Sequence, residues 1–382
     1  MTKHFAFLAL ATAALAACEQ NRSITNPAAA IASSLEAQHN IDGSGGSDGP
    51  GAVYTLTNQV AGNAVAVFTR GADGRLTAAG TVATGGAGTG ASLGSQSAVS
   101  LSNDGRRLFA VNAGSNDVSV FAVSPAGLAL ASRTASGGTL PISLTVHGNV
   151  LYVLNAGGSG NISGFTVGTS GDLTPIADAI LPLSGSTVGP ADVQFSPDGR
   201  HLVVTEKNTN LLDVYAVDAS GVASGPTTTA SAGGTPFGFA FGLRNDLFVS
   251  EAAGSASSYV LDASGTPALV SGAVSTHQGA PCWAVVTADG RFGFTGNGAG
   301  SVSAFAIAPD GAISLVDANG GTALIGSGIN DIALSHNSRY LYVLQTAGAQ
   351  AIHAFRVAAD GHLTALGPIA GLPAGTRGLA AF

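Results

Sequence analysis

Glu206 and Glu251 each follow a short apolar run at the same point of a repeated sequence pattern, where other copies carry small polar residues. Charged residues make up only 9% of the chain, so a carboxylate at a repeated position is unusual. A carboxylate or the imidazole of His277 can activate water, and Lys207 could stabilise the negative oxygen that then forms. These four residues are the predicted catalytic candidates. Contacts between repeats are the alternative role for the other three, and a surface-loop position is the alternative for His277.

A second group of residues lies near the starts or ends of other apolar runs. Aspartate is disfavoured inside strands, so Asp192 and Asp331 are expected either to bind a ligand or to bond the backbone of a neighbouring repeat. Arg377 is one of very few cations available at these positions. The predicted substrate-binding residues are Asp192, Asn297, Asp331, Arg377 and Trp283.

Several other chemistries are not supported by residue patterns. No two histidines show the spacing of a helical metal site, so no metal and no cofactor are expected, although a carboxylate-rich opening could hold Ca²⁺. Cys282 has no recognisable histidine partner for nucleophilic catalysis. The net charge is −8 and no run of Lys or Arg occurs, which argues against nucleic-acid binding.

The elements that would position these residues are short strands in a repeat that begins near residue 52. An aromatic residue recurs at intervals of 44 to 53 residues, and a glycine follows each one six positions later. Glycine at that offset predicts a tight hairpin with positive φ. The aromatics are Phe68, Phe121, Phe165, Tyr215, Tyr259, Phe305 and Phe355, and the glycines are Gly74, Gly127, Gly171, Gly221, Gly265, Gly311 and Gly361.

Four short strands per repeat predict an all-β, seven-bladed β-propeller of four-stranded antiparallel blades. The first copy begins at its second strand, Val53-Tyr54-Thr55-Leu56, so its inner strand is expected from residues 378–382, which would close the ring. The second strands are expected to end, at one mouth of the central channel, in Thr57, Asn112, Asn155, Glu206, Glu251, Gly296 and Gln345.

The N-terminus is predicted to be an export signal. Lys3 precedes an apolar run over residues 5–17 that is too short for an ordinary membrane span. Leu15-Ala16-Ala17-Cys18 resembles a bacterial lipobox, which implies cleavage before Cys18 and lipidation of that residue. The predicted domains are a signal peptide over 1–17, a flexible lipid-anchored linker over 18–50 and the propeller over 51–382. A plain secretory signal is the alternative, and the outer membrane is the expected location.

The run Phe195-Ser196-Pro197-Asp198-Gly199-Arg200, together with the blade spacing and the strand 340–343, resembles the seven-bladed lactonase family. That family includes 6-phosphogluconolactonase-like and carboxymuconate-cyclase-like proteins. The segments 204–208, 235–239, 250–252 and 280–283 resemble an exported branch of it. Family members often carry Pro-His where inner strands begin; here those prolines precede Ile142, Ala191 and Phe237, so no catalytic residue is transferred.

The resemblance implies an envelope enzyme that hydrolyses or isomerises a small non-phosphorylated lactone. Two cations, Lys207 and Arg377, are too few for a phosphate clamp, which argues against a phosphosugar. A non-enzymatic scaffold that binds a ligand or an envelope protein is the alternative, since fold does not fix chemistry. In either case the chain is expected to be monomeric, with membrane contact through its lipid only.

Overall fold

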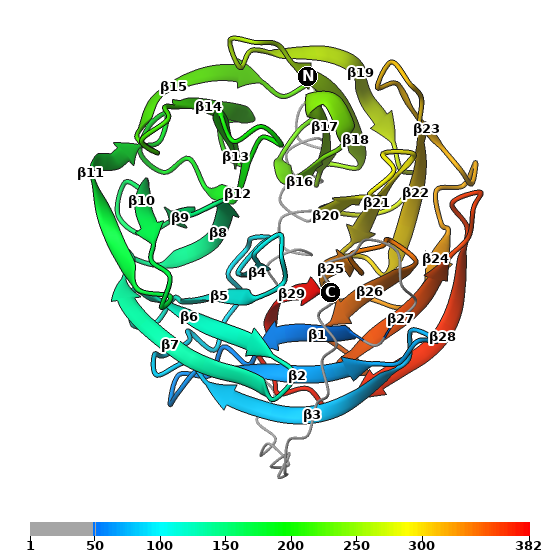
Figure 1. Cartoon of the computed structure of the whole chain (residues 1–382). Coiled ribbons are helices and arrows are strands. Elements are labelled where there is room, and N and C mark those ends of the chain that lie inside the picture. Colours follow the sequence, from blue (N-terminus) through cyan, green and yellow to red (C-terminus); the bar gives the residue numbers. More distant parts are fainter. Residues whose placement is uncertain (1–48, 50) are drawn as a thin grey trace, which may run out of the picture.

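Short apolar runs separated by glycine turns fold the repeats into seven antiparallel sheets, arranged in a ring around a central channel (Figure 1). The computed structural model describes Gly49 and residues 51–382. The predicted signal peptide, the lipidation at Cys18 and nearly all of the linker therefore lie outside the described residues.

The blades are numbered in chain order, and each contains an inner strand, two middle strands and an outer strand. Blade one contains β29 (Arg377–Ala381), β1 (Gly51–Leu56), β2 (Ala64–Arg70) and β3 (Leu76–Ala83). Blade two contains β4 (Val99–Leu101), β5 (Arg107–Asn112), β6 (Asp117–Ser124) and β7 (Gly127–Ala135). Blade three contains β8 (Pro141–His147), β9 (Val150–Asn155), β10 (Asn161–Val167) and β11 (Leu173–Pro182). Blade four contains β12 (Pro190–Phe195), β13 (His201–Glu206), β14 (Leu211–Val217) and β15 (Ala223–Ala230).

The remaining blades follow the same order. Blade five contains β16 (Pro236–Phe241), β17 (Asp246–Glu251), β18 (Ser255–Leu261) and β19 (Pro267–Ser275). Blade six contains β20 (Pro281–Val286), β21 (Phe292–Asn297), β22 (Ser301–Ile307), β23 (Ile313–Leu315) and β24 (Ala323–Leu324). Blade seven contains β25 (Ile329–Leu334), β26 (Tyr340–Gln345), β27 (Ala351–Val357) and β28 (Leu363–Ala370). A single turn of 3₁₀ helix, η1 (Leu243–Asn245), precedes β17.

The predicted closure of the ring is confirmed. β29 pairs antiparallel with β1, with Val53 opposite Ala381 and Tyr54 opposite Ala380. The first blade is thus completed by the C-terminal strand, which leaves no sheet open at the junction (Figure 1).

The hairpin glycines are also confirmed. All seven have positive φ, from 84° at Gly74 to 105° at Gly127, a region that a residue with a Cβ atom enters only with strain. The seven marker aromatics all lie on third strands, and all of them are buried between adjacent sheets. The glycine turns therefore reverse the chain between the third and fourth strands, and the aromatic side chains fill the space between blades.

Two blades depart from the regular pattern. The outer edge of blade six is split into β23 and β24, which both pair with β22. The inner strand of blade two, β4, is only three residues long, and the chain before it takes an irregular course. The irregular segment enters the central channel, where Gln96 bonds inner strands of other blades.

Every inner strand begins at the same end of the channel, which is also where second strands end, as the pairs Pro190–Glu206 and Leu56–Arg377 show. We call this end the upper mouth and the opposite end the lower mouth. The described residues contain no helix long and apolar enough to cross a membrane.

Candidate functional site

A ring of buried polar side chains marks the ends of the second strands. The sixth member is Asn297, the last residue of β21, and the prediction of Gly296 at this point was one residue off. The corrected ring is polar in all seven blades, and none of its members is more than 5% exposed. The members are Thr57, Asn112, Asn155, Glu206, Glu251, Asn297 and Gln345.

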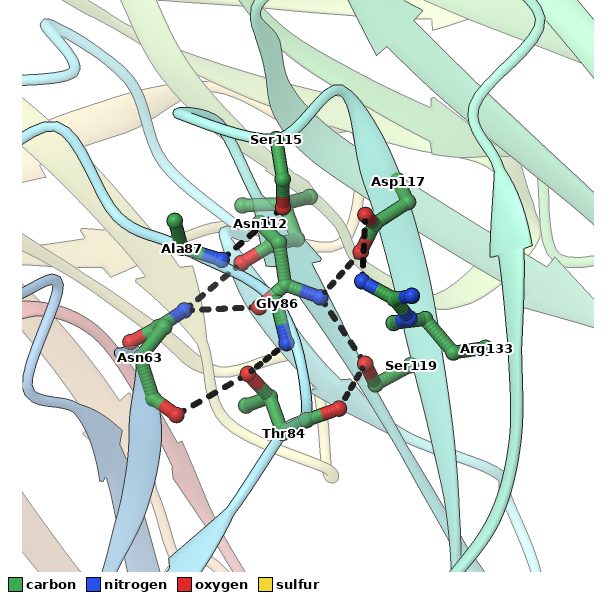
Figure 2. Close-up of polar contacts among 10 residues, drawn as sticks. Asn63, Thr84, Gly86, Ala87, Asn112, Ser115, Asp117, Ser119 and Arg133 are labelled. Carbon is green, nitrogen blue, oxygen red and sulfur yellow. Dashed lines mark hydrogen bonds and ion pairs between the residues drawn. The ribbon is translucent and has the colours of Figure 1, made fainter. Parts of the chain in front are cut away.

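Figure 2 shows the network around the blade-two member, Asn112. Its Nδ2 donates to Asp117 Oδ1 at 2.6 Å and to Ser119 Oγ at 2.8 Å, and its Oδ1 accepts from Asn63 Nδ2 at 3.0 Å. Ser119 Oγ in turn donates to the carbonyl oxygen of Thr84, in the connection from blade one, at 2.8 Å. The amide therefore ties blade two to the connection that precedes it.

Blade four has a pair of carboxyl groups at the corresponding place. Glu206 accepts hydrogen bonds from Ser184 N at 3.1 Å, Ser184 Oγ at 2.6 Å and Thr209 Oγ1 at 2.6 Å. Asp213 Oδ2 accepts from the same Ser184 N at 3.0 Å. Burial, and then the adjacent Glu206, raise the pKa of Asp213 to about 8. Asp213 therefore favours its protonated form beside Glu206 at neutral pH.

The blade-five member, Glu251, is surrounded by donors. Its Oε1 accepts from Ser231 Oγ, Gly233 N and Ser257 Oγ at 3.0, 2.7 and 2.6 Å, and its Oε2 accepts from Ser255 Oγ at 2.5 Å. A Cβ atom on Gly233 would lie within 1.9 Å of this carboxylate, so only glycine fits there. Like Asn112, Glu251 fastens its blade to the preceding connection.

The structure does not bring the predicted acid–base candidates together. Glu206 and Glu251 belong to separate blades and are fully buried in separate hydrogen-bond networks. His277 is exposed on the connection between β19 and β20, where its ring nitrogen and backbone N–H contact only Ser275. Its φ is positive, at 53°, and the corresponding turn position in the connection before blade three is occupied by Gly137, with a φ of 77°. The catalytic role of these three residues stays a prediction without geometric support.

Lys207, by contrast, lies at the upper mouth. Its Nζ donates to the carbonyl oxygen of Gly94 at 2.7 Å and sits 5.0 Å from the centroid of the Phe237 ring. Trp283 packs edge-on against Phe237 at 5.5 Å and donates its Nε1–H to the carbonyl oxygen of Ser95 at 3.0 Å. Both predicted site residues thus donate hydrogen bonds to the segment that precedes β4.

That segment, residues 93–98, crosses the channel, and we call it the channel strap. The Gln96 amide accepts from Ala284 N at 2.8 Å and donates to the carbonyl oxygens of Ala284 at 2.8 Å and Phe239 at 3.3 Å. The Gln96 backbone N–H donates to Ala191 O at 3.1 Å. The strap therefore links blade two to blades four, five and six, and Gln96 separates the upper mouth from the lower one.

Arg377, at the start of β29, is the second cation of the upper mouth. Only 3% of the residue is exposed, and its Nη1 donates to Thr376 O at 2.6 Å and to Thr346 Oγ1 at 3.4 Å. Nε and Nη2 have no hydrogen-bond partner among the described residues. Burial lowers the pKa of Arg377 to about 10, so the side chain remains cationic at neutral pH. These two nitrogens form one edge of the guanidinium plane, and their N–H donors are buried without an acceptor among the described residues.

Asp192 and Asp331 occupy equivalent bulged positions of two inner strands. Asp192 accepts from Ser143 Oγ at 3.0 Å and from Phe239 N of the next blade at 3.4 Å. Asp331 accepts from Leu379 N of the next blade at 2.9 Å. Burial raises the pKa of Asp192 to about 6 and that of Asp331 well above its usual range, the charge of Asp192 adding to the second shift. Both residues therefore bond neighbouring blades, as the structural alternative predicted.

Asn297, the remaining predicted binding residue, is buried at the end of β21. Its Nδ2 donates to Ser301 Oγ at 3.0 Å and Ser303 Oγ at 2.8 Å, both within blade six. Of the nine predicted catalytic and binding residues, Lys207 and Trp283 both contact the channel strap, and Arg377 lies at the start of β29, at the same end of the channel. Among the described residues, no group of three or more His, Cys, Asp or Glu could hold a metal ion.

Sequence reasoning missed Asp213 and Ser184. A signal for Asp213 existed, because the position two residues into each third strand repeats as a hydroxyl in four other blades: Ser119, Ser163, Ser257 and Ser303. An aspartate at that position, opposite a glutamate, indicates a carboxyl pair. Ser184 carries no such signal because it lies in a connection of variable length.

Comparison with known proteins agrees with this architecture. Residues 53–188 match the family model described as "Lactonase, 7-bladed beta-propeller", which confirms the predicted resemblance over that part of the chain. No sequence among the curated proteins matches the chain.

Solved structures extend the likeness of fold to most of the chain. A candidate 6-phosphogluconolactonase from Bacteroides fragilis superposes with a TM-score of 0.70 at 20% identity, over 87% of this chain and 98% of that one. The periplasmic gluconolactonase of Pseudomonas aeruginosa gives a TM-score of 0.69 at 18% identity, over 86% of this chain and 98% of that one. At these identities the likeness shows a common fold and leaves the chemistry to the site.

Proposed function

From the lactonase-family match of residues 53–188, we propose that this protein opens the ring of a small non-phosphorylated lactone at the upper mouth of its channel. Hydrolysis adds water across the ester bond and yields a hydroxy acid. Negative charge develops on the carbonyl oxygen as water attacks, and fixed cations at the mouth would stabilise that charge.

The observation that carries the proposal is the free edge of Arg377. A buried guanidinium with two unpaired N–H donors costs folding free energy, and the interaction with an anionic oxygen would offset this cost. Lys207 adds a second positive charge at the same mouth. Two cations suit one oxyanion, and they fall short of the several donors that a phosphate group requires.

The test is a pH-stat assay of the mature protein with glucono-1,5-lactone and γ-butyrolactone. Arg377→Lys keeps the positive charge and loses the planar guanidinium edge formed by Nε and Nη2. We therefore expect kcat/KM to fall by roughly a hundredfold, the scale of losing one oxyanion donor. Arg75→Lys is the matched control, because Arg75 is exposed and pairs only with Asp73. Ring opening no faster than the uncatalysed reaction would refute the enzyme, and an unaffected Arg377→Lys variant would refute the site.

One observation favours the second function, a non-enzymatic scaffold. All carboxylate oxygens of Glu206 and Glu251 accept hydrogen bonds from their own blades or connections, so neither is placed to activate water at the mouth. A scaffold would show no ring opening, and photo-crosslinking in intact cells would capture one defined envelope protein.

We also propose that the protein is exported and lipid-anchored through Cys18. The support is the lipobox-like sequence and the fold shared with a periplasmic protein from Pseudomonas aeruginosa. Cys18→Ser is expected to release the protein from the membrane fraction. A variant that remains in that fraction would contradict the anchor.

A further inference from the structure

A cleft of about 420 Å³ lies between blades two and three, on the side of the lower mouth. Phe109, Val146 and Val167 form its walls, and its exposed surface is more apolar than polar. One side of the cleft is open to water. This combination suits a ligand that has an apolar part and a charged end that keeps much of its hydration. The rim consists of three turns, residues 102–104, 148–149 and 168–169.

The cleft coincides with a departure of blade two from the repeat. The third residue of the second strand is Tyr152 in blade three and Tyr342 in blade seven, and each hydroxyl donates to a carbonyl oxygen of the next blade, at 2.7 and 3.0 Å. The corresponding residue of blade two, Phe109, has no hydroxyl and lines the cleft. Arg107 bonds the next blade instead, because its Nη1 and Nη2 donate to two carbonyl oxygens of blade three, at 2.8 and 2.5 Å.

Arg107 places a positive charge beside the apolar walls. Its hydrogen bonds go to backbone carbonyl oxygens, and no carboxylate among the described residues forms an ion pair with it. A guanidinium has five N–H donors and these bonds use two of them, so donors remain for an anionic group of a ligand.

Asp104 places a negative charge on the rim of the same cleft. Its Oδ1 accepts from Ser102 Oγ at 2.6 Å and from Arg106 N at 3.1 Å. Slight burial acts in the opposite direction, but these hydrogen bonds hold the pKa of Asp104 below its usual value, so the carboxylate is ionised at neutral pH. Asp104 Oδ2 has no partner among the described residues and can accept from a ligand.

We propose that this cleft binds a free α-amino acid with an apolar side chain. The side chain packs on the three apolar walls, the carboxylate meets Arg107, and the ammonium group meets Asp104. Both charged groups lie at the open rim and keep part of their hydration, so the apolar contact provides most of the affinity. The opposite charges of the rim select a zwitterion over a simple anion or cation. The site does not depend on the proposed ring-opening activity.

The experiment is saturation-transfer NMR of the purified protein at neutral pH with L-leucine and with two probes that each lack one of its charges. The probe 4-methylpentanoate lacks the ammonium group, and 3-methylbutylamine lacks the carboxylate. Leucine is expected to bind saturably, and each probe roughly fivefold more weakly, the scale of one exposed ion pair. No saturable leucine signal, or a probe that binds as tightly as leucine, would overturn the proposal.

Asp104→Asn removes the negative charge and keeps the turn. Blade seven carries Asn337 at the same turn position, where its Oδ1 accepts the same two hydrogen bonds, from Ser335 Oγ at 2.9 Å and from Arg339 N at 3.1 Å. We expect leucine to bind roughly fivefold more weakly, with no loss of affinity for 4-methylpentanoate. Asp289→Asn is the matched control, because Asp289 has this turn position in blade six, outside the cleft. Equal effects of the two variants on leucine would refute the site.

A second variant, Val167→Trp, fills the cleft from the wall of blade three and is expected to abolish the leucine signal. Val217→Trp is its control, because Val217 ends the third strand of blade four at the corresponding position, with the same partial burial. Circular dichroism shows whether each variant folds. Retained leucine binding in folded Val167→Trp would contradict the proposal, and Asp104→Asn decides the matter if Val167→Trp does not fold.

Discussion

In blades two and four, the polar residue that ends the second strand is held by hydrogen bonds of different kinds. In blade two a neutral amide, Asn112, donates to Asp117 and to Ser119 (Figure 2). In blade four two carboxyl groups, Glu206 and Asp213, face each other and share one backbone donor, Ser184 N. The amide provides its own donors, whereas the carboxyl pair must keep a proton to avoid like-charge repulsion. A glutamate at a repeated position can therefore be a structural substitute for asparagine.

The largest expected effect follows from removing the carboxylate of blade four. Glu206→Leu removes a fully buried carboxylate, takes away the acceptor of the Ser184 and Thr209 hydroxyls, and leaves Asp213 as the acceptor of Ser184 N. We expect the free energy of unfolding to fall by about 3–5 kcal/mol, the range for breaking a buried network that includes a charge. Urea denaturation measures it, with Glu206→Gln as the milder isosteric control. A loss below about 1 kcal/mol would remove the structural role.

A carboxyl pair can be transplanted into blade two by Asn112→Asp. The substitution removes both donors of Asn112 and places a second carboxylate against Asp117, so we expect a loss of about 2–3 kcal/mol at pH 8. The loss should be smaller at pH 5, where one carboxyl can hold a proton. Asn155→Asp is the matched control, because Asn155 faces Asn161 and Ser163 and no carboxylate. Equal losses in the two blades would contradict the comparison.

The raised pKa of Asp213 in blade four predicts a pH dependence. The pKa of Asp213 is about 8 in the folded protein, above the ordinary value of 3.8, so the folded state binds this proton more tightly than the unfolded state. Its contribution to stability is complete below about pH 4, declines as pH rises and is lost above about pH 8.

Asp213→Asn removes this titrating group and supplies an amide donor to Glu206. We expect a flatter profile of unfolding free energy between pH 4 and 8, and a Tm at pH 8 that is a few degrees higher than that of the unmodified protein. Thermal unfolding across this range measures both quantities. A variant that keeps the full slope would place the titration on another group.

The smallest expected effect concerns the rim of the blade-two network. Arg133 Nη1 lies 3.2 Å from Asp117 Oδ2, and its side chain is 47% exposed. Arg133→Met should therefore cost less than about 1 kcal/mol, and the difference should vanish in high salt. A larger, salt-independent loss would show that the arginine acts through packing.

The repeat in the sequence predicted the blades because each one depends on local features. Gly74 and its six counterparts have the positive φ that the turn requires, and the seven aromatics are buried on third strands as their spacing indicated. Ring closure was predictable for a related reason: the first copy lacks an inner strand, and residues 378–382 match one.

The candidate site was only partly predictable. The sequence located the polar ring at the ends of the second strands, and the structure shows that Glu206 and Glu251 use their oxygens within their own blades and connections. A single sequence does not distinguish a carboxylate that links blades from one that acts on a substrate. The two differ in which residues surround the carboxylate in the folded protein. For Glu251 those neighbours include Ser231 and Gly233, some twenty residues away in another blade's connection.

By itself, the sequence determined the strands, the tight turns, the number of blades and the position of the polar ring, because these follow from backbone preferences and from a pattern that repeats. Only the tertiary structure decided that the channel strap crosses the channel and that Arg377 has a free edge. The Gln96 side chain bonds Ala284, 188 residues further along the chain, and no local preference encodes such a contact. It forms because ring closure brings all seven inner strands to one axis, where a shortened strand leaves room for the chain that precedes it.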